Sequence, residues 1–339
     1  MYLVHSDKQS LFEIEYIEKL LLSKINQITK ITIEEFKNKD INENIIIYYS
    51  DSEKTVSDEI KLFLKNFKNN YFLIHISDES LIHDLSIYKN AIYTFRGYYS
   101  PNINTKKCFT VPIGFQSGYL RNKEIDIKNK NIIWSFFGQF YNDRKNMLQD
   151  LVDIKPNIYY KIDSFMDNSA IEVKYLEKIY SETIFAPCPN GFSNPDTFRI
   201  MEVLENGCIP IVKKFVFIDY FKFVFGNHPF IVVKRWKDSK ETIKKYLNKP
   251  EELENKQLEV SRWYKVFKEN LSKDVQSVIE ENNFNLISEQ KKYQKEGYLN
   301  VLVLFNFFYY FKLRKNKYFI KINKIIYKLK KQLRIVLNG

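Results

Sequence analysis

Two successive runs of alternating strand-like and helix-like segments limit the fold of this chain more than any other feature. In the first run, short stretches rich in Ile, Phe and Tyr predict strands at residues 45–49, 71–76, 91–95 and 108–111. Apolar residues at helical spacing predict helices at residues 11–28 and 56–67. Strands that alternate with helices favour a parallel sheet that is covered on both faces.

The pattern begins again after a polar, charge-rich segment at residues 121–130. Strands are predicted at residues 132–137, 158–162, 184–187, 208–212 and 230–234, and helices from about residue 143 and at 172–182 and 195–206. Residues 238–282 are expected to form consecutive helices that pack back across both halves. The sequence therefore predicts an α/β chain with two Rossmann-like doubly wound domains that face each other across a cleft, followed by C-terminal helices. The expected boundaries are residues 1–125, 126–296 and a tail at 297–339.

Length and cysteine content narrow the class of protein. The chain has 339 residues, enough for two domains that each bury a core. Its 3 cysteines include no CxxC motif and no pairing with His at zinc spacing, so neither a disulfide scaffold nor a structural metal site is expected. The N-terminal residues contain acidic side chains and no basic segment followed by an apolar run, so no signal peptide is expected. We expect a cytoplasmic protein.

The positive charge is concentrated at the C-terminus. The net charge is +12, and residues 297–339 contain ten Lys or Arg and no Asp or Glu, so the first 296 residues carry only +2. An apolar run at residues 299–311 is shorter than the roughly 17–25 residues that a membrane-spanning helix needs. The tail predicts peripheral binding to an anionic membrane surface at its inner face. The alternatives are a packing helix with a Lys-rich outer face and a basic nucleic-acid-binding segment.

The segment SETIFAPCPNGFSNPDTFRIMEVLENGCIPIV, residues 181–212, carries the clearest candidate site. Asn194 and Pro195 suit the start of the predicted helix and Gly207 suits its end. Arg199 could form a bidentate contact with a phosphate, and Glu202 could accept hydrogen bonds from two vicinal hydroxyl groups. The structural alternative is a solvated stripe of intrahelical salt bridges.

This segment resembles the signature region of exostosin-like glycosyltransferases, in which a Cys-Pro-x-Gly loop, a Ser/Thr-x-Arg helix, a Glu and a Gly-Cys-x-Pro strand occur in this order. The series HISDE, FRGYY, VPIGF and FFGQFYNDR is also similar to the related ribitol xylosyltransferase group. The resemblance implies a GT-B fold, a nucleotide-sugar donor bound mainly by the C-terminal domain, and no obligatory metal. The matching positions that are expected to bind the donor are Pro189, Gly191, Thr197, Arg199 and Glu202.

Two further sets of residues follow predicted strands, and two cysteines lie on either side of the signature helix. Gly138 would let the backbone approach a donor phosphate, and Arg144 would provide a second phosphate contact. Asp78 is the preferred base for an acceptor hydroxyl and Glu79 is the second candidate, although carboxylates after a strand also cap turns. Cys188 and Cys208 flank the signature helix, and buried free thiols are the expected state, so no catalytic cysteine is predicted.

These inferences lead to one expected function. The chain is expected to be a glycosyltransferase that moves a sugar, with inversion, from a nucleoside diphosphate to a hydroxyl of a bacterial surface glycan such as a capsule or lipopolysaccharide intermediate. UDP is the expected nucleotide, and no cofactor or metal is expected. The alternatives are a membrane-associated GT-B scaffold without activity and a basic nucleic-acid-binding protein.

Overall fold

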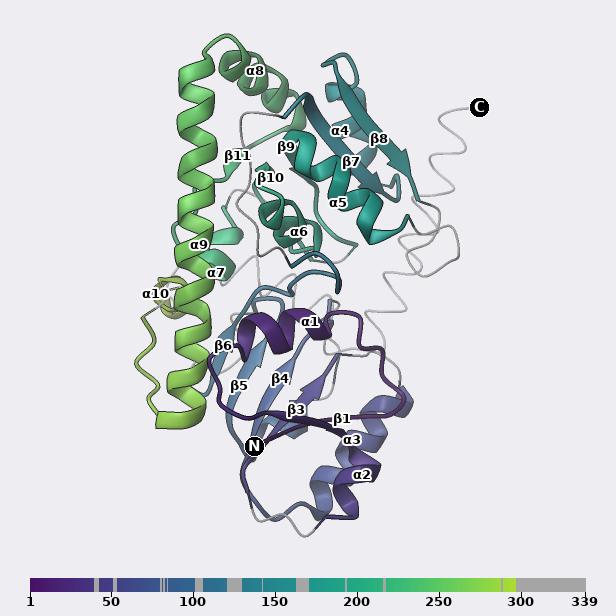
Figure 1. Ribbon diagram of the computed structural model, residues 1–339, viewed down its shortest axis with the longest axis vertical. Coiled ribbons are helices and arrows are strands. Elements are labelled where there is room, and N and C mark those ends of the chain that lie inside the picture. The colour runs from purple at the N-terminus through teal and green to yellow at the C-terminus, as the bar shows by residue number, and fades with distance from the viewer. Residues whose placement is uncertain are drawn as a thin grey trace, which may run out of the picture.

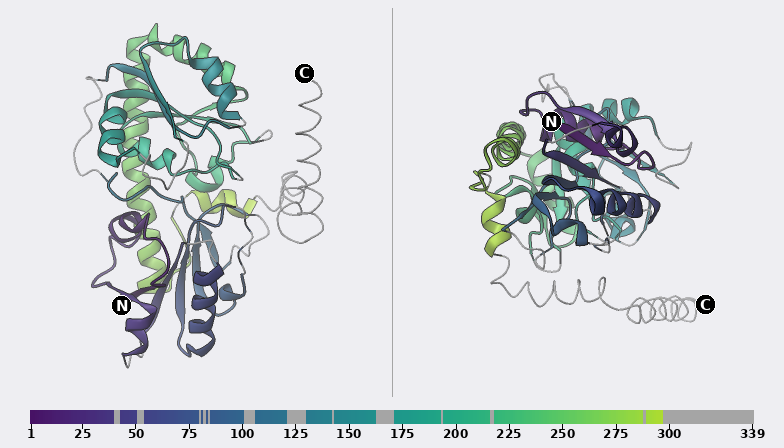
Figure 2. Two further views of the ribbon diagram at one scale, coloured as in Figure 1. Left: turned by 90° about the vertical axis from the view of Figure 1, so that its right-hand side faces the viewer. Right: turned by 90° about the horizontal axis from the view of Figure 1, so that it is seen from below.

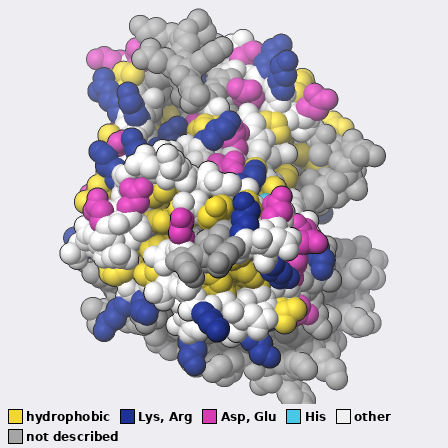
Figure 3. Space-filling view, turned by 60° about the horizontal axis from the view of Figure 1, so that its bottom comes forward, with side chains coloured by type: hydrophobic (Ala, Val, Ile, Leu, Met, Phe, Trp, Pro, Cys, Tyr) yellow, Lys and Arg dark blue, Asp and Glu magenta, His cyan; other side chains and the backbone are white. Residues whose placement is uncertain are grey.

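The computed structural model describes residues 1–39, 43–50, 54–79, 81, 83, 85–100, 106–120, 130–141, 143–162, 171–192, 194–215, 218–287 and 289–296. The predicted membrane-binding tail at residues 297–339 and nearly all of the predicted linker at 121–130 lie outside these ranges. Within them, no helix is both long and apolar enough to cross a membrane. Acidic and basic side chains are interspersed over the face shown in Figure 3, as the small net charge of the first 296 residues requires.

Two parallel sheets lie one above the other along the long axis of the molecule (Figure 1). The first sheet has the order β2-β1-β3-β4-β5-β6 and the second has the order β11-β10-β9-β7-β8. All pairings in both sheets are parallel. The first five strands of each sheet thus follow one order. In this order, successive strands are added first to one side and then to the other, and the change of side falls between β1 and β3 in the first sheet and between β7 and β9 in the second. Such reversals place a crevice at the carboxyl ends of the strands.

The strands of the first sheet include two that the sequence analysis missed. These are β1 (Tyr2–His5) and β2 (Thr29–Thr32), and the predicted strands appear as β3 (Ile45–Tyr49), β4 (Tyr71–His75), β5 (Ala91–Arg96) and β6 (Cys108–Thr110). Predicted helix 11–28 was too long. Only α1 (Ile14–Tyr16) and a π-helical turn, η1 (Ile17–Leu21), form there. The Ser23 hydroxyl donates a hydrogen bond to the Leu20 carbonyl at the end of that turn, which helps to stop the helix.

Short helices complete the first half of the molecule. They are α2 (Ile33–Lys37), α3 (Lys54–Asn66), which matches predicted helix 56–67, and a 3₁₀ turn, η2 (Leu85–Tyr88). α2 and α3 pack on the outer face of the sheet, where they close a separate apolar cluster with β3 and β4. The other face of the sheet joins the main core.

The second sheet follows the prediction closely. Its strands are β7 (Ile132–Gly138), β8 (Asn157–Lys161), β9 (Thr183–Cys188), β10 (Ile209–Lys213) and β11 (Ile231–Val233), and the helices between them are α4 (Asp143–Leu151), α5 (Val173–Glu182), α6 (Arg199–Glu205) and α7 (Phe221–Phe225). Predicted helix 195–206 is wrong at its start, because α6 begins at Arg199. The Asn194 side chain instead accepts a hydrogen bond from the Asp196 backbone N–H, which holds residues 194–198 in an irregular turn.

The C-terminal helices tie the two halves together. After α8 (Trp236–Leu247), the long helix α9 (Pro250–Glu281) runs past both sheets (Figures 1 and 2). It spans about 48 Å at 1.5 Å per residue. Lys268 on α9 pairs with Glu205 of the second half at 2.9 Å, and Gln276 donates to the Lys24 carbonyl of the first half at 2.9 Å. The final helix, α10 (Gln290–Glu296), packs on α7 and on strand β6 of the first sheet.

Candidate active site

A cavity of about 470 Å³ lies between the two sheets, among loops that follow strands in both halves. β7 and β9, the strands at the reversal point of the second sheet, lead into its walls at Gly138 and Gly191. The first half contributes the segments that follow β4, β5 and β6, through Ser77, Tyr98 and Ile113. The cavity therefore lies where doubly wound folds bind their ligands, outside the carboxyl ends of the strands.

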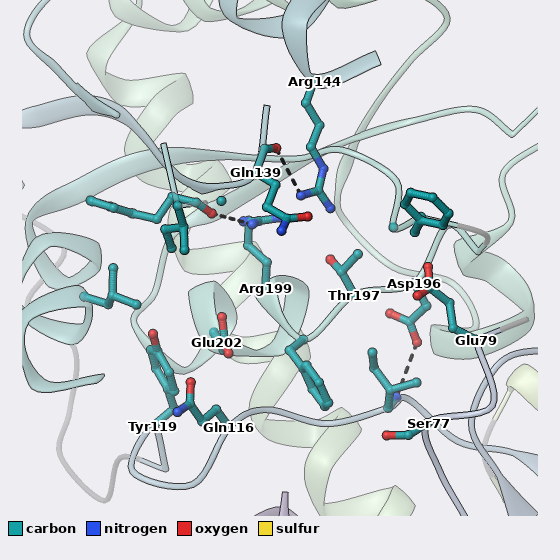
Figure 4. A pocket seen from close by; sticks show the side chains of 18 of the residues that line it. Ser77, Glu79, Gln116, Tyr119, Gln139, Arg144, Asp196, Thr197, Arg199 and Glu202 are labelled. Atoms are coloured by element: carbon teal, nitrogen blue, oxygen red, sulfur yellow. Dashed lines mark hydrogen bonds between the residues drawn. The ribbon is translucent and has the colours of Figure 1, made fainter. Parts of the chain in front are cut away.

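Seven predicted site residues line this cavity, although they come from three segments far apart in the sequence. They are Glu79, Gly138, Arg144, Gly191, Thr197, Arg199 and Glu202. In Figure 4, Glu202 lies at one end with Gln116 and Tyr119, the two arginines lie in the middle, and Glu79, Asp196 and Ser77 lie at the other end. Pro189 is buried and does not line the cavity.

Two guanidinium groups converge beside Gly138. A Cβ atom on this glycine would lie 2.7 Å from Arg199 Nη2 and 3.4 Å from Arg144 Nη1, and the glycine has a φ of +154°. The absence of a side chain therefore allows both arginines to approach the end of β7. Burial, and then the neighbouring charge of Arg199, lowers the pKa of Arg144 to about 10. Two close positive charges in a partly buried cleft favour a ligand with at least two negative charges.

Arg199 keeps donors available for such a ligand. Its Nη2 donates to the Phe137 carbonyl at 2.5 Å, and its guanidinium lies 4.5 Å from the centre of the Phe136 ring. Its Nε and Nη1 atoms are buried and have no hydrogen-bond partner among the described residues, and the same holds for Thr197 Oγ1. Buried donors without a partner are rare because each costs about 1–3 kcal/mol, and an anion in the cavity would satisfy them.

Arg144 is held more firmly than Arg199. Its Nε and Nη2 donate to the Asn190 carbonyl at 3.4 and 3.2 Å, and its Nη1 donates to the Gln139 carbonyl at 3.3 Å. Its guanidinium also lies 4.2 Å from the centre of the Tyr141 ring. Arg144 therefore fixes the loop after β9 while it faces the cavity.

Buried carboxyl groups occupy both ends of the cavity. Burial raises the pKa of Glu202 to about 7, although Arg199 and the Gln116 backbone N–H both favour its ionised form. Burial also raises the pKa of Asp196 to about 7, against hydrogen bonds from the backbone N–H groups of Ile113 and Thr197. Asp196 precedes α6, whereas Arg199 and Glu202 lie on that helix.

The two candidate bases, Asp78 and Glu79, have different surroundings. Asp78 is 2% exposed, does not line the cavity, and accepts a hydrogen bond from Arg96 Nη2 at 3.0 Å and one from the His83 backbone N–H at 3.2 Å. Glu79 lines the cavity, and its Oε1 accepts a hydrogen bond from the Asn194 backbone N–H at 3.3 Å. A Cβ atom on Gly191 would lie 2.6 Å from the same oxygen. Glu79 thus extends from the first half of the molecule to the loop that follows β9 in the second half.

A cluster near Asp78 has the composition of a metal site. His75, Asp78 and His83 bring ligand atoms within 4.8 Å of one another. His75 Nε2 and His83 Nδ1 are 2.9 Å apart and share a hydrogen bond, and His75 Nδ1 bonds the Tyr88 hydroxyl at 2.6 Å. Arg96 already places a positive charge beside Asp78. The group is therefore a satisfied polar network in the core of the first half.

Several cavity residues were missed by sequence reasoning. Tyr141 and Phe192 line the cavity from the segments FFGQFYNDR and 181–212, which the sequence analysis singled out without assigning these two residues a role, and Gln116 and Tyr119 follow the segment VPIGF. Cys188 and Cys208 are buried free cysteines, and burial raises the pKa of the Cys188 thiol.

Comparisons with known proteins agree with this architecture. Residues 128–284 match the family model described as RXYLT1 C-terminal domain. This match corresponds to the predicted resemblance to the ribitol xylosyltransferase group. The resemblance to exostosin-like glycosyltransferases stays a prediction. No curated protein sequence matches the chain.

Among solved structures, the chain is similar to a DNA-modifying β-glucosyltransferase studied with and without uridine diphosphoglucose, at 11% identity and a TM-score of 0.52. The match covers 82% of this chain and 98% of that one. The T4 phage enzyme in complex with UDP and Mn²⁺ gives 11% identity and a TM-score of 0.52 over 82% of this chain and 99% of that one. An α1,3-fucosyltransferase gives 10% identity, a TM-score of 0.47 and coverage of 80% and 90%. The fold of this chain is GT-B.

Proposed function

From this GT-B fold and its cleft, we propose that the protein is a glycosyltransferase that takes a sugar from a nucleoside diphosphate, with UDP as the nucleotide. The observation that carries the proposal is the pair of arginines at Gly138, in which Nε and Nη1 of Arg199 are buried and have no partner among the residues that the structure describes. A diphosphate would accept hydrogen bonds from these donors and offset both charges. The two β-glucosyltransferases to which the chain is similar were studied with uridine diphosphoglucose or UDP as the ligand.

The order of polar groups along the cavity suggests the orientation in which a nucleotide sugar would bind. Glu202, with the Gln116 backbone N–H beside it, would accept hydrogen bonds from the ribose hydroxyls at one end. Arg199 and Arg144 would hold the diphosphate in the middle and stabilise the charge that grows on it as the sugar leaves. The sugar would then face Glu79 and Asp196 at the other end.

Glu79 is the proposed base. Its carboxylate would remove the proton from the acceptor hydroxyl as the acceptor oxygen bonds to the anomeric carbon, and the bond from that carbon to the diphosphate oxygen would break. A single displacement of this kind inverts the anomeric centre. We propose a hydroxyl of a bacterial surface glycan intermediate as the acceptor.

Replacement of Glu79 by glutamine tests the base. We expect Glu79→Gln to bind UDP as wild type does and to transfer sugar about 100-fold more slowly, because an amide cannot take the proton. The measurement combines a thermal-shift panel of nucleotide sugars with UDP release from the donor that binds. A donor at 100 times its dissociation constant stabilises the protein by about 2.7 kcal/mol. Undiminished release by Glu79→Gln would move the role to another carboxylate, and a panel without any stabilising nucleotide would overturn the donor assignment.

We propose that residues 297–339 bind the inner face of the membrane, on the basis of their ten basic residues and the adjoining apolar run. Full-length protein should sediment with vesicles that contain anionic lipid, and a chain that ends at residue 296 should stay in the supernatant. High salt should weaken the interaction only in part, because it screens charge but leaves apolar burial unchanged. Equal sedimentation of both chains would refute the proposal.

A further inference from the structure

A second, smaller hollow of about 190 Å³ adjoins the main cavity. The two share the wall formed by Tyr141, Arg144, Gly191 and Phe192. The hollow lies on the side of this wall that faces Asn190, Asn194 and Phe215. It therefore continues from the cavity past the loop that follows β9.

The polar groups of this hollow are incompletely satisfied. Asn194 is 2% exposed, and its Nδ2 has no hydrogen-bond partner among the described residues although its Oδ1 accepts from the Asp196 backbone N–H at 3.4 Å. Asn190 Oδ1 is also buried without a partner in the described chain. One amide thus offers a donor and the other offers an acceptor, which is the pair that sugar hydroxyls satisfy because each hydroxyl both donates and accepts.

An aromatic pair stands at the shared wall. Phe192 is 75% exposed, an unusual position for a large apolar side chain, and its ring centre lies 5.6 Å from that of Tyr141 at an interplanar angle of 63°. An exposed aromatic ring beside a pocket offers a flat apolar surface to a ligand that enters the pocket. The apolar C–H face of a sugar ring suits such a surface.

The charged residues of the hollow are already engaged. Asp143 accepts from Lys213 Nζ at 2.6 Å and from Trp236 Nε1 at 2.7 Å. Arg144 donates to the Asn190 and Gln139 carbonyls. With Arg144 assigned to the diphosphate of the main cavity, the hollow offers a ligand two neutral amide groups and aromatic rings, so it favours a neutral polyhydroxyl ring over a phosphate or a peptide carboxylate.

We propose that this hollow is a second sugar subsite, which holds the sugar next to the one that receives the new linkage. The inference rests on the proposed function, since it makes the acceptor of that reaction a glycan of at least two residues. The main cavity would take the reacting sugar, and the Phe192–Tyr141 wall would hold its neighbour.

The test measures binding of defined saccharides by saturation-transfer-difference NMR, with and without saturating UDP. The panel contains methyl glycosides of glucose, galactose, mannose, xylose and N-acetylglucosamine and the disaccharides lactose, maltose, cellobiose and chitobiose. Wild type is compared with Phe192→Ala, Asn190→Ala and a control, Leu62→Ala, which truncates an apolar side chain on α3 that is 61% exposed. A duplex DNA oligonucleotide serves as a competitor.

We expect at least one disaccharide to bind more tightly than its monosaccharide glycosides, and to bind about fivefold to tenfold more weakly to Phe192→Ala and Asn190→Ala than to wild type and Leu62→Ala. UDP affinity should be equal in wild type, Asn190→Ala and Leu62→Ala, whereas Phe192 also lines the main cavity. Disaccharide binding that Phe192→Ala leaves unchanged, no binding across the panel, or displacement by DNA would overturn the subsite. Failure of wild type to bind UDP, with saccharide binding still dependent on Phe192, would instead reject the proposed donor and retain the subsite.

Discussion

Replacement of Arg199 by alanine is expected to weaken UDP binding about 100-fold or more. The variant removes two buried donors that have no partner in the described part of the chain, and hydrogen bonds from a charged group contribute about 1.5–3 kcal/mol each. It also leaves Arg144 alone beside Gly138, with half of the positive charge. Isothermal titration with UDP measures the loss directly.

Two companion variants make this result specific. Arg199→Lys should recover only part of the affinity, because an ammonium group keeps the charge but loses the planar fork that binds a phosphate through two hydrogen bonds. Arg262→Ala removes an exposed arginine on α9 and should bind UDP as wild type does. Thermal unfolding followed by circular dichroism checks that each variant is folded. UDP affinity of wild-type strength in Arg199→Ala would remove the basis of the proposed donor site.

Replacement of Arg96 by methionine is expected to destabilise the protein by about 3–5 kcal/mol. Arg96 is 1% exposed and donates to Asp78 Oδ2 at 3.0 Å, to the Tyr88 hydroxyl at 2.9 Å and to the Tyr98 carbonyl at 3.2 Å. Its loss would leave the Asp78 carboxylate buried without a compensating charge. Urea unfolding, followed by tryptophan fluorescence, gives the change in free energy of unfolding.

The control for Arg96 is an ion pair on the surface. Arg235, the residue before α8, and Asp238 on that helix are 2.9 Å apart, and the arginine side chain is 65% exposed. Arg235→Met should therefore change the unfolding midpoint little, since solvent screens exposed pairs. An Arg96→Met protein as stable as wild type would show that Asp78 does not depend on Arg96 and would restore Asp78 as a candidate base.

The Asp78→Asn variant needs the same measurement of stability, because loss of sugar transfer in that variant could follow from unfolding.

The order of strands and helices was predictable because each element has its own local signal. Buried parallel strands such as β3 read as continuous apolar runs, since both faces are covered. The missed strands illustrate the limit of this signal. β1 is only four residues long, and β2 carries the sequence TKIT with two exposed positions, so neither has the length or the apolar content that separates a strand from a loop.

The start of α6 shows a second limit. Asn194 and Pro195 form a pattern that is typical of a helix start, and the same Asn side chain also stabilises a non-helical turn. The two outcomes differ by local hydrogen bonds of similar strength. Contacts from the other half, such as the hydrogen bond from the Asn194 N–H to Glu79, favour the turn.

The sequence alone determined the two α/β units and the residue types that suit a donor site at Arg144, Arg199 and Glu202, because short-range periodicity and motif spacing encode both. It led to a preference for Asp78 over Glu79 as the base, although the two are neighbours at the end of one strand and local sequence does not distinguish their surroundings. Only the tertiary structure separated them: Arg96, from the adjacent strand β5, neutralises Asp78 in the core, while Glu79 lines the cavity and meets Asn194 across the cleft. The environment of a carboxylate depends on groups that are distant in the chain, and local sequence does not encode which of them fold against it.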